Sequence, residues 1–348
     1  MSRLARFPRF AGTGVAAVAL TVLASTAPTA SATSRTSVEP PASITLSDPR
    51  IIAHFDYAKG ETPENIALEP DGSADLSFAF ARQVVRVSKH GETEPLATLP
   101  PAADPATPLI GVAVTTGLVR THDGSIYVTY LTGRDDQTGV WRIAPDGSLE
   151  RFAALPGTSF ANGLALDEEH GLLYAADSVL GKVWRISLDD GSVTTWATGT
   201  ALTPDGFIGA NGIKVRHDAV WVSNADRGTL LRIPVEEDGS AGAIETRATG
   251  LTRIDDFAFF GPGESVLAAL NATSQVALVR PDGTHTILLN PEDGLSNPTS
   301  VAVRHRTVYV PSASFNTTVK DPNLLLARLI KGDKGDKGDK GDKKGDKG

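Results

Sequence analysis

Six oxygen-bearing side chains recur along the chain, each just before a short apolar stretch. They lie at intervals of 52, 46, 49, 44 and 44 residues and belong to Glu64, Thr116, Asn162, Asn211, Asp255 and Thr299. Two carboxylates together with amide and hydroxyl oxygens form the ligand set that hard divalent cations prefer. If these six anchor residues converge in space, they predict a cation site. The expected ion is calcium.

The Asn-Gly pairs at two of these positions also have a purely structural explanation. Asn162-Gly163 and Asn211-Gly212 each precede a strand, where Asn and Gly tolerate a tight turn and the Asn side chain can bond its own backbone. This explanation suffices for any single anchor residue. It does not explain why six polar residues recur at similar intervals, so both explanations stay open.

The intervals themselves indicate the fold. Repeats of roughly 40 to 50 residues with short strands are typical of β-propeller blades. The third repeat shows the pattern in full, with the apolar runs GLALD, LLYAAD, KVWRIS and VTTWAT separated by Gly-containing turns. We therefore predict an all-β, six-bladed propeller with four antiparallel strands per blade. A β-sandwich of short strands would not explain the repeat length.

The last repeat lacks a fourth strand before the chain becomes highly charged. An unassigned apolar stretch, RIIAHFDYA, runs from Arg50 to Ala58, ahead of the first repeat. If this N-terminal strand completes the last blade, the ring closes and leaves no sheet edge exposed. The predicted propeller then covers residues 50–330.

Both ends of the chain differ from this repeat region. Residues 1–32 have the layout of a signal peptide, with Arg3, Arg6 and Arg9, a short apolar run and Ala30-Ser31-Ala32 before an expected cleavage after Ala32. Residues 33–49 are predicted to be a linker, and residues 331–348, rich in Gly, Asp and Lys, a disordered tail. The mature protein is therefore expected to be secreted.

Composition limits the partners. The formal net charge is −8 and there is no Cys, so thiolate chemistry and disulfides are excluded. No basic stripe offsets the acidic charge, which makes nucleic acid an unexpected partner. No later stretch is long and apolar enough for a membrane span. We expect a monomer that binds a small molecule.

The predicted loops at the mouth of the propeller are long and carry aromatic residues. Tyr130, Phe160, Phe207 and Phe315 are expected to contact substrate there, beside the hydroxyls of Thr116 and Thr299. An apolar rim above an oxygen-lined floor suits a partly hydrophobic substrate. Packing between blades is an equally good explanation for any single aromatic residue. Four of the seven His residues fall in hairpins on the opposite face, so no His-based dyad is expected at the mouth.

Several motifs resemble the gluconolactonase, senescence marker protein and LRE-like family. They are Pro-Glu-Asn-Ile-Ala from Pro63, Asn-Gly-Leu-Ala with Leu-Tyr-Ala-Ala-Asp-Ser in the third repeat, and Lys-Val-Trp-Arg-Ile. The resemblance implies a six-bladed propeller with one divalent cation in its channel, acting on lactones or related esters. It also implies that Glu64 and Asn162 correspond to the first-blade and third-blade ligands. Together with Asn211 and Asp255 they form the expected ligand set of the ion.

The chain departs from the family pattern in the fourth repeat. Asn211 stands where the family usually has an Asp that binds metal and can act as a general base, and an amide cannot accept a proton in this way. Asp255 is therefore the candidate catalytic base. The closing stretch LSNPTSVAVRHRTVYVPSASF is similar to secreted propellers that include hetero-Diels–Alderases. A non-hydrolytic cyclase or isomerase and a small-ligand-binding propeller remain alternatives to a metal-dependent lactonase or esterase.

Overall fold

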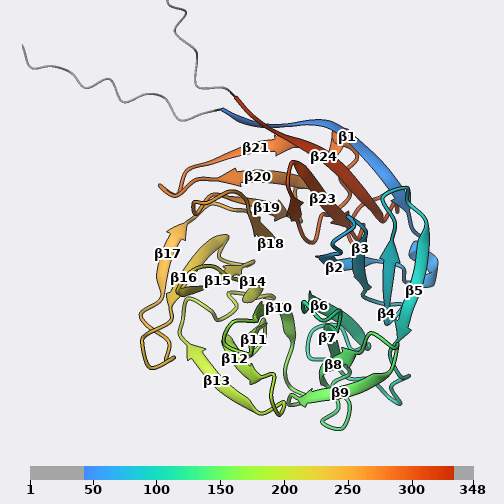
Figure 1. Ribbon diagram of the computed structural model, residues 1–348, viewed down its shortest axis with the longest axis vertical. Helices are drawn as coiled ribbons and strands as arrows, with labels where there is room; N and C mark the ends of the chain where they lie inside the picture. Colours follow the sequence, from blue (N-terminus) through green and yellow to red (C-terminus); the bar gives the residue numbers. More distant parts are fainter. Residues whose placement is uncertain (1–42, 333–348) are drawn as a thin grey trace, which may run out of the picture. The chain divides into compact units, whose positions relative to one another are not determined.

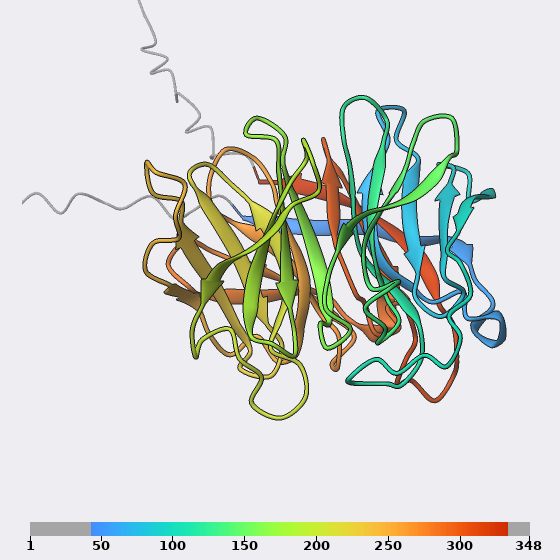
Figure 2. The same cartoon turned by 90° about the horizontal axis from the view of Figure 1, so that it is seen from below.

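Twenty-four strands form six antiparallel sheets of four, and the sheets follow one another around a common axis (Figure 1). The computed structural model describes residues 43–332. Seen from the side, in Figure 2, the loops project from both ends of the strands, and so from both faces of the propeller. The predicted six-bladed propeller with four strands per blade is confirmed.

Each blade is given from its innermost to its outermost strand. Blade 1 consists of β2 (Pro63–Leu68), β3 (Ala74–Phe78), β4 (Gln83–Val87) and β5 (Thr93–Thr98). Blade 2 consists of β6 (Val114–Arg120), β7 (Ile126–Leu131), β8 (Gly139–Ile143) and β9 (Leu149–Ala154). Blade 3 consists of β10 (Ala161–Asp167), β11 (Leu172–Asp177), β12 (Lys182–Ser187) and β13 (Val193–Thr198).

The remaining blades follow in the same order. Blade 4 consists of β14 (Ala210–Val215), β15 (Ala219–Asn224), β16 (Thr229–Pro234) and β17 (Glu245–Ala248). Blade 5 consists of β18 (Ile254–Phe259), β19 (Val266–Leu270), β20 (Gln275–Val279) and β21 (His285–Leu289). Blade 6 consists of β22 (Ala302–Arg304), β23 (Thr307–Ser312), β24 (Asn323–Lys331) and β1 (Ile44–His54). Two short 3-10 helices, η1 (Tyr57–Lys59) and η2 (Pro291–Asp293), lie in loops.

The N-terminal strand completes blade 6, as predicted. β1 pairs antiparallel with β24 from Ile44↔Lys331 to His54↔Asn323. It begins at Ile44 rather than Arg50, so the end of the predicted linker 33–49 is strand. β24 likewise extends to Lys331, the first residue of the predicted tail. The predicted signal peptide and the rest of the linker and tail lie outside the described residues, apart from residues 43 and 332.

This closure gives the first prediction. Deleting residues 43–54 should expose the edge of β24, whose backbone N–H and C=O groups then lose their partners, and should cause aggregation or early melting. A chain that ends at Gly332 keeps every described strand and serves as the control, with an unchanged melting temperature. Light scattering during a thermal melt measures both effects. Normal melting of the protein without β1 would contradict closure by this strand.

Asp-Gly turns join strands in five of the six blades. The Asp residue is followed by Gly and then by Ser or Thr, and its carboxylate accepts the backbone N–H two residues on at 2.8–3.0 Å. The six Asp residues are Asp71, Asp123, Asp146, Asp190, Asp238 and Asp282. Each Gly that follows adopts a positive φ, which Gly accepts without steric cost. The Gly-containing turns predicted between the strands of the third repeat are therefore confirmed there, and the same kind of turn recurs in four other blades.

The hydrophobic core consists of six clusters, and each cluster fills the space between two neighbouring blades. Because the middle strands are covered on both faces, apolar residues occupy most of their positions. β19, with the sequence VLAAL, is buried at every position. The cluster between blades 6 and 1 includes Ala53 of β1 and Leu324 of β24.

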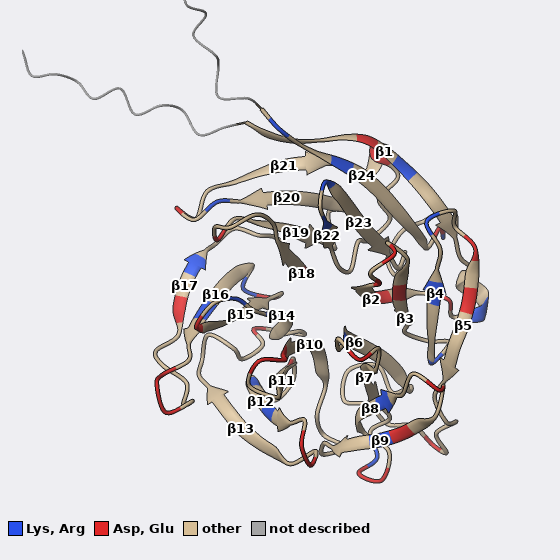
Figure 3. Cartoon of the chain, in the orientation of Figure 1, with Lys and Arg blue, Asp and Glu red and all other residues tan. Residues whose placement is uncertain are grey.

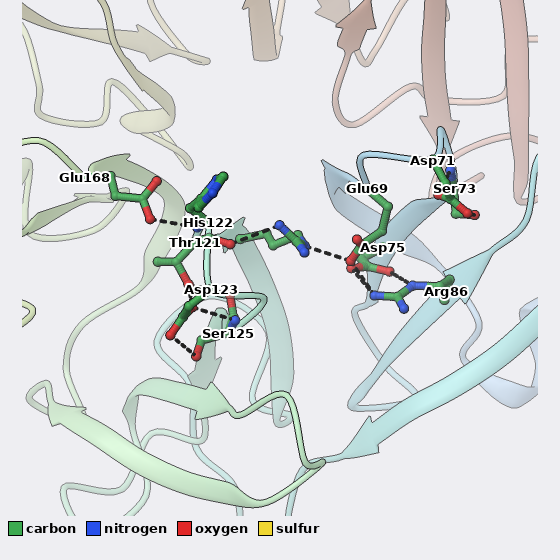
Figure 4. Close-up of polar contacts among 11 residues, drawn as sticks. Glu69, Asp71, Ser73, Asp75, Arg86, Thr121, His122, Asp123, Ser125 and Glu168 are labelled. Atoms are coloured by element: carbon green, nitrogen blue, oxygen red, sulfur yellow. Dashed lines mark hydrogen bonds and ion pairs between the residues drawn. The ribbon is translucent and has the colours of Figure 1, made fainter.

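Ion pairs add to the packing between blades 1 and 2. Arg86 on β4 donates to both carboxylate oxygens of the fully buried Asp75, at 2.7 and 3.0 Å, and to Glu69 at 2.5 Å (Figure 4). Glu69 also accepts from Arg120 at the end of β6, at 2.7 Å. The carboxylate of Glu69 therefore joins two blades at the end of β2 opposite Glu64. Elsewhere, Lys and Arg are interspersed with Asp and Glu around the propeller (Figure 3).

Candidate functional site

Five of the six anchor residues line one cavity. The main cavity, as we call it, measures about 360 Å³ and is lined by Glu64, Thr116, Asn162, Asn211 and Asp255. Each of these residues is the second or third residue of the innermost strand of a different blade. The predicted convergence is therefore confirmed for blades 1 to 5. A cavity of this size is in the range of small-molecule sites.

A β-bulge interrupts each of these five inner strands at the anchor residue. The register with the neighbouring strand shifts between Pro63 and Asn65, Thr115 and Leu118, Ala161 and Gly163, Ala210 and Ile213, and Ile254 and Phe257. A bulge turns side chains away from the strict alternation of a strand. The repeated bulge therefore lets consecutive residues of one strand face the central channel.

The residues that follow the anchors form a second layer in the channel. Asp256 is buried and accepts hydrogen bonds from Ser300 Oγ at 2.7 Å and from Asn65 Nδ2 at 3.2 Å. Lys214 Nζ lies 2.6 Å from both carboxylate oxygens of Asp256. Because these residues come from blades 1, 4, 5 and 6, their contacts close the channel beneath the main cavity.

On the other side of the channel the second layer is formed by glycines. A Cβ atom on Gly163 would lie 2.3 Å from the carbonyl oxygen of Asn211, and one on Gly212 would lie 2.4 Å from Asp256 Oδ1. A Cβ atom on Gly117 would likewise lie 2.5 Å from the backbone nitrogen of Leu164. The Asn-Gly pair thus has two functions. Asn lines the cavity, and Gly allows the next inner strand to approach closely.

This close approach predicts a large difference between two glycines. Gly163→Ala should destabilise the fold by about 2 kcal/mol, because the obstructing atoms belong to the backbone and cannot move aside cheaply. Gly263→Ala is the control, since no atom lies within 4 Å of the added methyl group, and it should change stability by less than about 0.5 kcal/mol. Urea unfolding of the two variants beside the parent measures both. Equal stability of all three would show that the inner strands can separate freely.

The two carboxylates of the main cavity are buried without full compensation. Glu64 Oε2 has no hydrogen-bond partner among the described residues. Burial, and then the charge of Asp256, raise the pKa of Glu64 to about 8. Burial and the charges of Glu64 and Asp256 likewise raise the pKa of Asp255, and hydrogen bonds from Asn211 and Asn271 oppose this shift. Asn271 Nδ2 lies 3.1 Å from Asp255 Oδ2.

These features fit a divalent cation. A positive ion between the two carboxylates would offset their mutual repulsion and would give Glu64 Oε2 a partner. Asn162 and Asn211 add neutral oxygens from two further blades. The described residues contain no cluster of three or more His, Cys, Asp or Glu side chains of the kind that holds a metal ion. A cation here would therefore depend on the two amides as well.

Two of the predicted substrate contacts, Thr299 and Tyr130, lie outside the cavity. Thr299 is fully buried outside the cavity, and its hydroxyl donates to the carbonyl of Pro63 at 2.9 Å. Tyr130 packs between blades 1 and 2, and its hydroxyl donates to the carbonyl of Pro100 at 2.6 Å. Thr116 does line the cavity, but its hydroxyl donates to the carbonyl of Ala161 at 2.9 Å. Both threonines therefore fasten neighbouring inner strands together.

The wall of the main cavity is largely apolar. Phe160, Phe207 and Phe315 line it, as predicted, and Phe80 and Ile110 join them. Phe80, Ile110 and Phe207 are among the most exposed large hydrophobic residues of the described chain, at 39%, 39% and 45%. Exposed apolar side chains gathered at a cavity mark a binding surface.

Buried aspartates hold two of the loops in this wall. Asp177 accepts the backbone N–H of Phe160 at 3.1 Å. Asp226 Oδ2 accepts the backbone N–H groups of Asp205, Phe207 and Ile208 at 2.9, 2.6 and 3.0 Å. The positions of Phe160 and Phe207 are therefore fixed by aspartates at the end of β11 and just after the end of β15.

Sequence reasoning missed Asp256, Lys214 and Asn271. In a regular strand Asp256 would point away from Asp255, so alternation alone predicts the opposite face. The bulge in β18 overturns that expectation. Asn271 lies in the loop between β19 and β20, a type of loop that was expected at the mouth, but no feature of the sequence distinguished this residue.

The described residues include no helix long and apolar enough to cross a bilayer.

The histidines lie where they were expected. His122, His170, His217 and His305 are in the hairpins between the first and second strands of their blades. Those hairpins join the ends of the inner strands opposite the anchor residues.

Comparison with known proteins gives a family match and several structural neighbours. The family model described as SMP-30/Gluconolactonase/LRE-like region matches residues 61–264, which is more than half of the chain. No curated protein matches the chain in sequence.

The solved structures show the same fold at low sequence identity. PQQ-bound aldose sugar dehydrogenase from Streptomyces coelicolor is 15% identical, with a TM-score of 0.61, over 84% of this chain and 100% of that one. A structural genomics target assigned as a gluconolactonase is 15% identical, with a TM-score of 0.59, over 82% of this chain and 93% of that one. Virginiamycin B lyase from Staphylococcus aureus is 13% identical, with a TM-score of 0.56, over 83% of this chain and 100% of that one.

Proposed function

Because the chain belongs to the SMP-30/gluconolactonase/LRE-like family, we propose that it is a divalent-metal-dependent hydrolase of a lactone or ester. The observation that carries this proposal is the pair of buried carboxylates in one cavity, where Glu64 Oε2 has no hydrogen-bond partner within residues 43–332. Glu64, Asn162, Asn211 and Asp255 would hold the ion, with calcium as the expected metal. A bound divalent cation would supply Lewis acidity toward the substrate carbonyl.

In this proposal Asp255 is the general base. Asn211 cannot accept a proton usefully, whereas Asp255 can once it is ionised. The hydrogen bonds from Asn271 and Asn211 favour its ionised form and fix the orientation of the carboxylate. In each turnover Asp255 would take one proton from the attacking water and later return it to the leaving alcohol oxygen.

The apolar wall would bind the hydrophobic part of the substrate and exclude bulk water. Phe160, Phe207 and Phe315 offer no hydrogen bonds to a polyhydroxylated ring, so a partly hydrophobic substrate fits better than a sugar.

The layout of residues 1–32 supports secretion, and the scattered basic residues in Figure 3 suit a protein without nucleic-acid partners. We include a monomeric state in the proposal.

A second candidate is a non-hydrolytic cyclase or isomerase that uses the same cavity as a template. Asn211 favours it, because this residue replaces the carboxylate that the family resemblance leads one to expect in the fourth blade. The apolar wall would suit such a function equally well, and the same surface could simply bind a small ligand.

Hydrolysis assays separate these functions. The purified protein should hydrolyse at least one member of a panel of lactones and aryl esters, lose this activity in chelator and regain it with calcium. Asp255→Asn should lower kcat/KM at least a hundredfold, the usual size of a general-base effect. Tightly bound metal without turnover of any ester or lactone would favour the template function and contradict the hydrolytic one.

A further inference from the structure

A second, smaller cavity adjoins the main one. This annex, as we call it, measures about 320 Å³ and shares Phe207, Asn211, Asp255 and Asn271 with the main cavity. It adds Arg253, which lies just before β18 and two residues from Asp255. The shared residues make the annex an extension of the site.

Arg253 is the only Lys or Arg among the described residues that line either cavity. Its side chain is 43% exposed, whereas its partner Asp226 is almost completely buried. Arg253 adopts a left-handed backbone conformation, with φ of 51°. Non-Gly residues are uncommon in this left-handed conformation, and surrounding contacts must offset its energetic cost.

One edge of the guanidinium is already engaged. Arg253 Nη1 pairs with Asp226 Oδ1, while Asp226 Oδ2 holds the loop that carries Phe207 and Ile208. Within the described part of the chain, the Arg253 side chain forms no further hydrogen bond. Its Nε and Nη2 groups therefore retain donors for a ligand in the annex. The planar guanidinium suits a carboxylate, which it can bind through two parallel hydrogen bonds.

We propose that Arg253 selects substrates that carry a carboxylate. The apolar body of such a molecule would lie against Phe207 in the main cavity, and its carboxylate would bind Arg253 in the annex. This inference rests on the proposed function in placing the substrate in the main cavity, and it narrows the substrate class to hydrophobic lactones or esters with an acidic group. Arg253 is here a specificity-determining residue, and the ester chemistry stays with Asp255.

A matched pair of probes that cannot be hydrolysed under the assay conditions tests this. 4-Phenylbutyrate has an aromatic ring and a carboxylate, and 4-phenylbutanamide replaces the charge with a neutral amide of the same shape. Calorimetry in calcium should show that the parent binds the carboxylate at least tenfold more tightly, as expected for a hydrogen bond to a charged group. Arg253→Gln should abolish this preference.

Two further variants make the result specific. Arg227→Gln is the matched control, because Arg227 pairs with Asp205 at 3.7 Å and lines neither cavity, so the preference should persist. Arg253→Lys retains a charge for Asp226 but lacks the planar guanidinium, so its preference should be intermediate. If Arg253→Gln does not fold, this lysine variant carries the test.

The possible results are distinct. Equal binding of the two probes by the parent, or a preference that survives in both Arg253 variants, would overturn the proposal and point to the cation as the carboxylate's partner. An Arg253-dependent preference without any ester hydrolysis would support the annex and contradict the proposed hydrolytic function. Hydrolysis without any Arg253-dependent preference would support the hydrolytic function and contradict carboxylate binding in the annex.

Discussion

Replacing Glu64 by Gln should greatly reduce the rise in melting temperature that calcium produces. The change removes one of the two carboxylates in the main cavity and leaves a neutral amide in its place. Asp255→Asn should have a similar effect for the same reason. If each change weakens calcium binding a hundredfold, a calcium concentration well above the dissociation constants of both parent and variant stabilises each variant by about 2.7 kcal/mol less.

Thr116→Ala is the control for this experiment. Its hydroxyl donates to the carbonyl of Ala161, so its loss should lower the baseline melting temperature without changing the calcium-dependent increase. Differential scanning fluorimetry in chelator and in graded calcium measures both quantities for all four proteins. The same calcium-dependent rise in all of them would mean that the anchor residues serve only the fold, and the metal hypothesis would have to be abandoned.

The apoprotein should become less stable as the pH rises from about 5 to 8. Burial and the charge of Asp256 raise the pKa of Glu64 from 4.5 to about 8, so the folded state holds a proton that the unfolded state releases. A raised pKa contributes stability that is fully present below pH 4.5 and is lost as the pH passes 8. For Glu64 alone the full loss is of the order of 5 kcal/mol. Asp255 shifts in the same direction.

Urea unfolding in chelator at a series of pH values tests this expectation. Other groups titrate in the same range, so the informative quantity is the difference between the parent and Glu64→Gln, which removes the titrating group. The variant should be the more stable protein at pH 8 and should show a flatter pH dependence. Calcium should bind the parent more tightly as the pH rises, because the ion displaces the proton. A parallel pH dependence of the two proteins would contradict the raised pKa.

The sequence alone determined the repeat, the number of blades and the closing strand. Each of these depends on local features that recur along the chain: apolar runs of strand length, Asp-Gly turns and anchor residues at similar intervals. It also identified Glu64, Asn162, Asn211 and Asp255 as neighbours. In a propeller the starts of the inner strands meet around the channel, so equivalent positions in different repeats meet as well.

Only the tertiary structure decided which hydroxyls and aromatic rings reach the cavity. Thr299 occupies a position whose equivalents in the other blades line the cavity, but contacts with the neighbouring blade bury Thr299 and Tyr130 and use their hydroxyl groups. The bulge in β18 places Asp256 in the channel beside Asp255, where Lys214 pairs with it. A register shift depends on how a strand pairs with its neighbour, and a contact between blades depends on the residues of the next blade. The order of residues within one strand therefore reveals neither.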